Sequence, residues 1–65
     1  MSQVALISGG GGGIGGAVAH RMARAGLEVV VADYDLDAAE KVRGEIVRGG
    51  GKAEALSVDV TQARE

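Results

Sequence analysis

The apolar positions of this chain form short runs separated by longer amphipathic stretches. Val4–Ser8 is a continuous apolar run, Leu27–Asp33 has three consecutive valines at its centre, and Ala53–Asp59 alternates in part between apolar and polar residues. Runs of this length, bounded by glycine or acidic residues, are typical of buried strands. The pattern therefore predicts three strands separated by two longer elements.

The two longer stretches repeat their apolar residues at helical spacing. The first predicts a helix from about Gly13 to Ala25, ended by Gly26 as its C-terminal cap. The second predicts a helix over Leu36–Arg48 with Asp35 as its N-cap. His20 falls toward the polar side of the first helix and is interpreted as a solvated residue. The expected apolar faces are Ile14, Val18, Met22 and Ala25 in the first helix, and Leu36, Ala39, Val42, Ile46 and Val47 in the second.

Alternating strands and helices predict an α/β fold of the Rossmann type, in the order β-α-β-α-β. Such alternation implies parallel strands joined by right-handed crossovers. Right-handed crossovers give three parallel strands in the order 3-2-1 and place both helices on one face of the sheet. The other face is expected to be bare, as in an incomplete doubly wound sheet.

The composition narrows the class of protein. The chain has 65 residues, so it holds at most one small domain. Cysteine is absent, which excludes disulfides and thiolate metal sites, and no residue is predicted to be a metal ligand. The formal net charge is −2 with mixed signs along the chain, which argues against nucleic-acid and membrane partners. No signal peptide or membrane-length apolar run is present, so a cytoplasmic protein is expected.

A glycine-rich segment, Gly9–Gly16, joins the first strand to the first helix and is interrupted only by Ile14. Glycine there permits a tight turn and a close approach of the backbone to a pyrophosphate, which the helix N-terminus attracts. The segment allows more than one G-x-G-x-x-G register, so that match alone is weak. No Lys follows the paired glycines, which argues against a Walker A loop.

The register of the segment is fixed by Ser8 at the end of the strand. Ser8-Gly9-x-x-x-Gly13-Ile14-Gly15 resembles the T-G-x-x-x-G-I-G fingerprint of the short-chain dehydrogenase/reductase family, with Ser in place of Thr. The resemblance implies an NAD(P)-binding Rossmann domain, of which residues 1–65 are the N-terminal part. The cofactor-binding residues expected in this segment are Ser8, Gly9, Gly12, Gly13, Ile14 and Gly15.

An acidic residue, Asp33, ends the second strand. A carboxylate there accepts hydrogen bonds from the adenosine ribose and repels a 2′-phosphate. Two unit charges 4 Å apart interact by about 4 kcal/mol at an effective dielectric of 20. Gly12 and Tyr34 occupy the positions where NADP-binding relatives usually carry Arg or Lys. These residues favour NAD over NADP, with Tyr34 expected near the adenine edge or on the surface.

The resemblance adds a third cofactor contact at the end of the third strand. In the family, an Asp-Val pair there meets the adenine, and Asp59-Val60 matches it. The Asp carboxylate would accept from the exocyclic amine, and the Val backbone would meet a ring nitrogen.

The catalytic residues implied by the resemblance are absent. The family uses a Ser, a Tyr and a Lys four residues beyond the Tyr, whereas the only Tyr is Tyr34 and position 38 is Ala38. We therefore expect a chain truncated before the catalytic half and inactive by itself. The full-length protein would be a homo-oligomeric oxidoreductase that transfers a hydride between nicotinamide and an alcohol or ketone. A non-catalytic nucleotide-binding module and an NADP-dependent reductase fragment remain alternatives.

Overall fold

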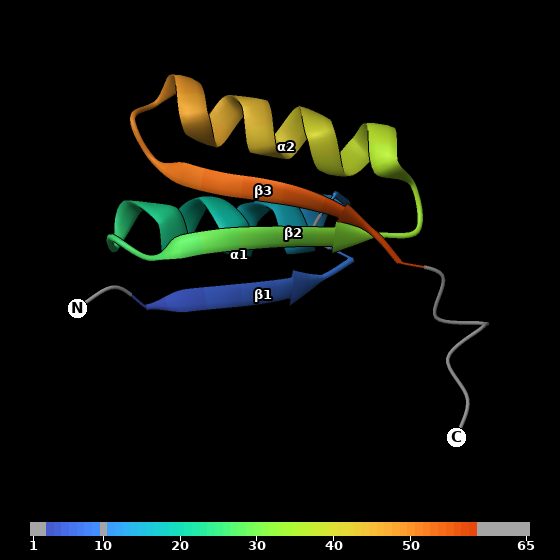
Figure 1. The fold of residues 1–65 in the computed structure, drawn as a ribbon, viewed down its shortest axis with the longest axis horizontal. Helices are drawn as coiled ribbons and strands as arrows, with labels where there is room; N and C mark the ends of the chain where they lie inside the picture. Colours follow the sequence, from blue (N-terminus) through green and yellow to red (C-terminus); the bar gives the residue numbers. More distant parts are fainter. Residues whose placement is uncertain (1–2, 10, 59–65) are drawn as a thin grey trace.

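A computed structural model describes residues 3–9 and 11–58 of the chain. In this part the chain forms an α/β fold (Figure 1). Its elements in chain order are β1 (Val4–Ser8), α1 (Gly13–Arg24), β2 (Glu28–Asp33), α2 (Leu36–Arg48) and β3 (Lys52–Ser57). The β-α-β-α-β order confirms the sequence prediction, and only the ends of α1, β2 and β3 differ from it by a residue or two.

The strands form one parallel sheet in the order β1-β2-β3, which is the predicted 3-2-1 order. Val4 pairs with Glu28, and Glu28 pairs with Lys52, so the three strands begin level with one another. The arrowheads in Figure 1 point the same way, so the carboxyl ends of all three strands meet at one edge of the sheet. The following loops therefore converge at this edge.

Both helices cover the same face of the sheet, as expected. The buried core of the described residues consists of Ala19, Val29, Val31, Ala39, Val42 and Ile46, with Ile7, Ala23, Ala53 and Ala55 packed against it. On the opposite face Val4 and Leu6 are 62% and 66% exposed. The predicted bare face is therefore present in the described part of the chain.

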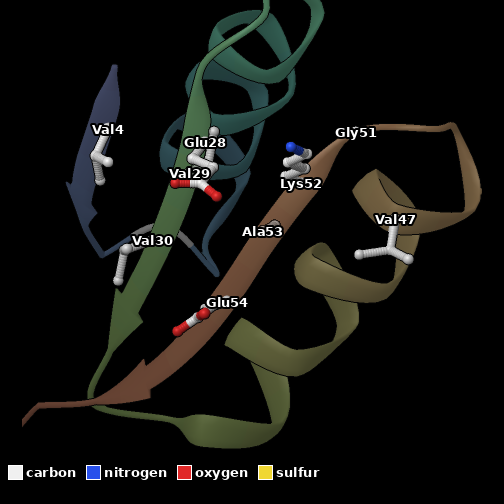
Figure 2. Close-up of a pocket in the computed structure, with 9 residues that line it drawn as sticks. All are labelled: Val4, Glu28, Val29, Val30, Val47, Gly51, Lys52, Ala53 and Glu54. Atoms are coloured by element: carbon white, nitrogen blue, oxygen red, sulfur yellow. The ribbon is translucent and has the colours of Figure 1, made fainter. Parts of the chain in front are cut away.

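The bare face carries a hollow. This hollow measures about 460 Å³ and reaches across the amino-terminal halves of the strands. Figure 2 shows Val4, Val30 and Glu54 along it, with Val47 contributed by α2. The described side chains that line it are apolar or carry charges of opposite sign, and they contain no cluster of chemically reactive groups. The hollow lies away from the carboxyl edge of the sheet.

The predicted apolar face of α1 is wrong for three of its four residues, since only Val18 is half-buried. Ile14 is 86% exposed and Met22 is 37% exposed, and Ala25 lies on the surface. The residues of α1 that are buried are Gly16 and Ala19. The helix meets the sheet through these small residues because a small side chain lets a helix backbone approach a β-sheet closely. In α2 the prediction holds for Ala39, Val42 and Ile46, whereas Leu36 and Val47 are 43% and 45% exposed.

The helix ends follow the expected capping chemistry. Gly26 has φ +96°, its N–H donates to the Ala23 carbonyl at 3.0 Å, and the Leu27 N–H donates to the Met22 carbonyl at 3.2 Å. This pair of bonds is the Schellman motif, for which a left-handed glycine is favoured. At the start of α2 the Asp35 carboxylate accepts from the N–H groups of the first turn, which confirms it as N-cap.

His20 is partly exposed to solvent, as predicted, and it also joins the two helices, which the sequence did not predict. Its Nε2 atom lies 3.0 Å from Oε1 of Glu45, and both side chains are 39% exposed. The contact crosses from α1 to α2. The periodicity of one helix does not reveal a polar partner on another.

Candidate functional site

The carboxyl edge of the sheet holds a small hollow beside the glycine segment. It measures about 170 Å³ and is lined by Ser8, Gly9, Ala32, Asp33, Tyr34 and Val58. Four of the predicted cofactor-binding residues therefore line this hollow: Ser8, Gly9, Asp33 and Tyr34. In open α/β sheets ligands bind outside the carboxyl ends of the strands.

The glycine segment turns tightly where it leaves β1. Gly9 has φ +69°, a left-handed conformation that side chains with a Cβ rarely adopt. The Gly12 N–H donates to the Gly9 carbonyl at 3.1 Å, which closes the turn. Gly12 is then the N-cap residue of α1. β1 ends at Ser8 and α1 begins at Gly13, so the strand and the helix follow closely on one another.

The start of α1 is free of capping side chains. Gly12 provides no side-chain hydrogen bond to the helix, and the first turn contains no acidic residue. A helix leaves its first N–H groups without partners inside the helix and carries a partial positive charge there of roughly half a unit. Gly13, Ile14 and Gly15 form this first turn, with Ile14 exposed to solvent. The helix start can therefore receive an anionic group.

Asp33 lies at the centre of the edge and is half-buried. Its Oδ2 atom accepts the Gly11 N–H at 2.9 Å, and its Oδ1 atom accepts the Asp35 N–H at 2.8 Å. Its backbone carbonyl accepts the Val58 N–H at 2.9 Å. Asp33 therefore connects the end of β2 to the glycine segment, to the turn before α2 and to the residue after β3.

Gly11 is a site residue that sequence reasoning missed. A Cβ atom added there would lie 2.7 Å from the Ala38 Cβ, 2.8 Å from the Ala38 carbonyl carbon and 2.9 Å from the Ala39 nitrogen. A strand-and-helix pattern carries no signal for this contact, because the glycine segment and α2 are far apart in sequence.

Residues 3–65 match the family model described as short chain dehydrogenase. The chain belongs to the short-chain dehydrogenase family. This confirms the resemblance carried by Ser8, Gly9 and the glycines after them.

Relatives of known structure share the fold. The 7α-hydroxysteroid dehydrogenase of Escherichia coli (strain K12) is 46% identical over 63 residues, which cover 97% of this chain and 25% of that enzyme. A solved 7α-hydroxysteroid dehydrogenase in complex with NADH and 7-oxo glycochenodeoxycholic acid superposes with a TM-score of 0.89 at 45% identity, covering 92% of this chain and 24% of that one. A metagenomic short-chain oxidoreductase in complex with NADP also reaches 0.89, at 36% identity, over 95% of this chain and 28% of that one.

The chain spans only 9% to 26% of the length of curated relatives in the short-chain dehydrogenase family that it matches. Asp59 and Val60, the predicted adenine contacts, lie outside the residues that the structure describes. Within residues 3–9 and 11–58, no group of three or more His, Asp or Glu side chains is arranged to hold a metal ion. No helix in the described part is long and apolar enough to cross a membrane.

Proposed function

We propose that this chain is the N-terminal, adenosine-binding part of an NAD-dependent oxidoreductase of the short-chain dehydrogenase family. The observation that carries the proposal is the position of the Asp33 carboxylate. It lies in the hollow at the carboxyl edge with Ser8, Gly9 and Tyr34, beside the uncapped start of α1. An anionic pyrophosphate and a ribose diol are the two groups that such a helix start and such a carboxylate recognise.

The residues present fit the adenosine half of a dinucleotide. The pyrophosphate would be held by N–H groups of Gly13, Ile14 and Gly15, because no side chain of the described part caps the start of α1. Gly12 would lie beside the pyrophosphate, since its own N–H donates to the Gly9 carbonyl. Each carboxylate oxygen of Asp33 accepts a hydrogen bond from one backbone N–H group. A carboxylate has about four acceptor positions, so positions remain for ribose hydroxyls. Asp59 and Val60 are proposed as the adenine contacts.

NAD is proposed as the cofactor in preference to NADP. Solved relatives include one in complex with NADH and one in complex with NADP, so membership of the family leaves both open. In this proposal the Asp33 carboxylate would face a 2′-phosphate with a charge of the same sign, and Gly12 and Tyr34 would supply no positive charge to compensate. The local chemistry therefore favours the unphosphorylated ribose.

The proposed reaction of the whole protein is hydride transfer between nicotinamide and an alcohol or ketone carbon. A relative of this chain is a 7α-hydroxysteroid dehydrogenase, which is consistent with a secondary alcohol. The 65 residues contain no Tyr-x-x-x-Lys sequence. We therefore expect no NADH formation when the chain alone is incubated with NAD and a panel of secondary alcohols.

Titration of the ¹⁵N-labelled chain with NAD tests the proposed binding site. The amide resonances of Ser8, Gly9 and Gly12–Gly15 are expected to shift together and to saturate. Gly26 and Gly50 lie at the opposite edge of the sheet and serve as internal controls, because both follow the helix C-termini. Saturable shifts confined to Gly26 and Gly50, or no saturable shift at any amide, would contradict the proposal.

A further inference from the structure

We infer that Asp33 is a positioning residue for the glycine segment, in addition to its proposed contact with ribose. Its carboxylate accepts the Gly11 N–H and so holds the segment before α1 in the conformation that receives the pyrophosphate. The inference rests on the proposed function for the identity of the ligand, whereas the contacts that carry it belong to the protein alone.

The two carboxylate oxygens of Asp33 have separate backbone partners. Oδ2 accepts the Gly11 N–H at 2.9 Å and Oδ1 accepts the Asp35 N–H at 2.8 Å. Hydrogen bonds to an ionised acceptor are shorter and roughly twice as strong as neutral ones. One side chain therefore joins the segment before α1 to the turn before α2.

The backbone of Asp33 is itself held by the sheet. Its carbonyl accepts the Val58 N–H at 2.9 Å, and Asp33 stands opposite Ser57 in the register of β2 and β3. The preceding residue, Ala32, is opposite Ser8 in β1 and is 4% exposed. The carboxylate therefore projects from a fixed point, and the two loops are positioned relative to that point.

Gly11 lies against the first turns of α2 too closely for any side chain. A Cβ there would come within 3.0 Å of three atoms, of which the Ala38 carbonyl carbon and the Ala39 nitrogen belong to the backbone. Backbone atoms of a helix cannot rotate away as the end of a side chain can. The absence of a Cβ at Gly11 is what allows its N–H to reach Asp33.

Substitution of Asp33 is therefore expected to act in two ways at once. It changes the preference between ribose and 2′-phosphoribose, and it also releases the glycine segment. The second effect weakens both dinucleotides alike, so it changes the two affinities without changing their ratio.

Amide hydrogen exchange on the ¹⁵N-labelled chain, without nucleotide, tests the inference. In Asp33→Ala the Gly11 and Asp35 amides are expected to exchange at least about tenfold faster than in the wild type, the factor that corresponds to a hydrogen bond to a charged group. Asp33→Asn keeps one acceptor oxygen and should give an intermediate increase. Asp37→Asn makes the same change of charge in the first turn of α2 and should leave both amides unchanged. Unchanged exchange at Gly11 in Asp33→Ala, with the sheet amides intact, would overturn the inference.

A second pair of variants keeps the test decisive if Asp33→Ala does not fold. Gly11→Ala is expected to move the Asp35 amide resonance and to speed exchange at position 11. Gly13→Ala is the matched control, because a Cβ there meets no atom within 4 Å. A Gly11→Ala chain with unmoved Asp35 and Gly12 amides would contradict the inference. Since no nucleotide is present, failure of this test is distinct from failure of NAD to bind.

Discussion

At the scale of the residue, single atoms decide what the carboxyl edge can do. Gly9 supplies a left-handed φ of +69°, and Gly11 supplies the space that a Cβ would fill. Asp33 supplies two acceptor oxygens, each already bonded to a loop N–H. Glycine is therefore required at these two positions for different reasons, one conformational and one steric.

Gly9→Ala is expected to lower the free energy of unfolding by about 1–2 kcal/mol, the cost of a left-handed conformation for an L-residue. A Cβ at Gly9 meets no atom within 4 Å, so conformational strain alone sets this loss. Urea unfolding of the chain measures it. Gly13→Ala has the same open surroundings without a positive φ and should be neutral or slightly stabilising. Equal midpoints for the two variants would contradict this account.

At the scale of the element, sequence reasoning succeeded where local chemistry decides. The limits of α2 and its N-cap Asp35 follow from a capping side chain and a helical period. The buried face of α1 could not be found in this way, because hydrophobicity points to Ile14 and Met22 whereas packing uses Gly16 and Ala19. Close approach of a helix to a sheet selects for small size, which a hydrophobic pattern does not record. The contacts of Asp33 with the glycine segment were likewise invisible, since they depend on the tertiary fold.

The N-cap of α2 provides a prediction at this scale. The Asp35 Oδ1 atom accepts the Asp37 N–H at 3.0 Å and the Ala38 N–H at 3.4 Å. Asp35→Ala removes this cap and should lower the free energy of unfolding by about 0.5–2 kcal/mol, measured by urea unfolding. Asp35→Asn keeps a side-chain oxygen and should retain most of the stability. A loss in Asp35→Asn as large as in Asp35→Ala would mean that charge, not capping, is what matters.

At the scale of the whole molecule, the sheet has one covered face and one bare face within residues 3–9 and 11–58. The core in the described part consists of six buried residues, between the sheet and the two helices. A domain of this size buries only roughly 60% of the surface of its unfolded chain, so its stability is marginal. Substitutions on the two faces should therefore differ sharply in effect.

Ile46→Ala is expected to cost about 2–5 kcal/mol and so to remove most of the stability of the chain. Ile46 is 3% exposed between α2 and the sheet. Leu6→Ala is the matched control on the bare face, where Leu6 is 66% exposed, and should change the free energy of unfolding by less than about 0.5 kcal/mol. Circular dichroism across a urea series compares the two. A larger loss for Leu6→Ala would show that the bare face is covered in solution.

The affinities for NAD and NADP, measured by isothermal titration calorimetry, test the central claim most directly. The wild type should bind NAD at least about tenfold more tightly than NADP, since like charges a few ångströms apart cost more than the ~1.4 kcal/mol that a factor of ten requires. Asp33→Asn should abolish this preference, whereas Glu28→Gln, the same change of charge at the other end of β2, should preserve it. An equal or tighter affinity for NADP in the wild type would contradict the assignment of Asp33 as the residue that selects NAD.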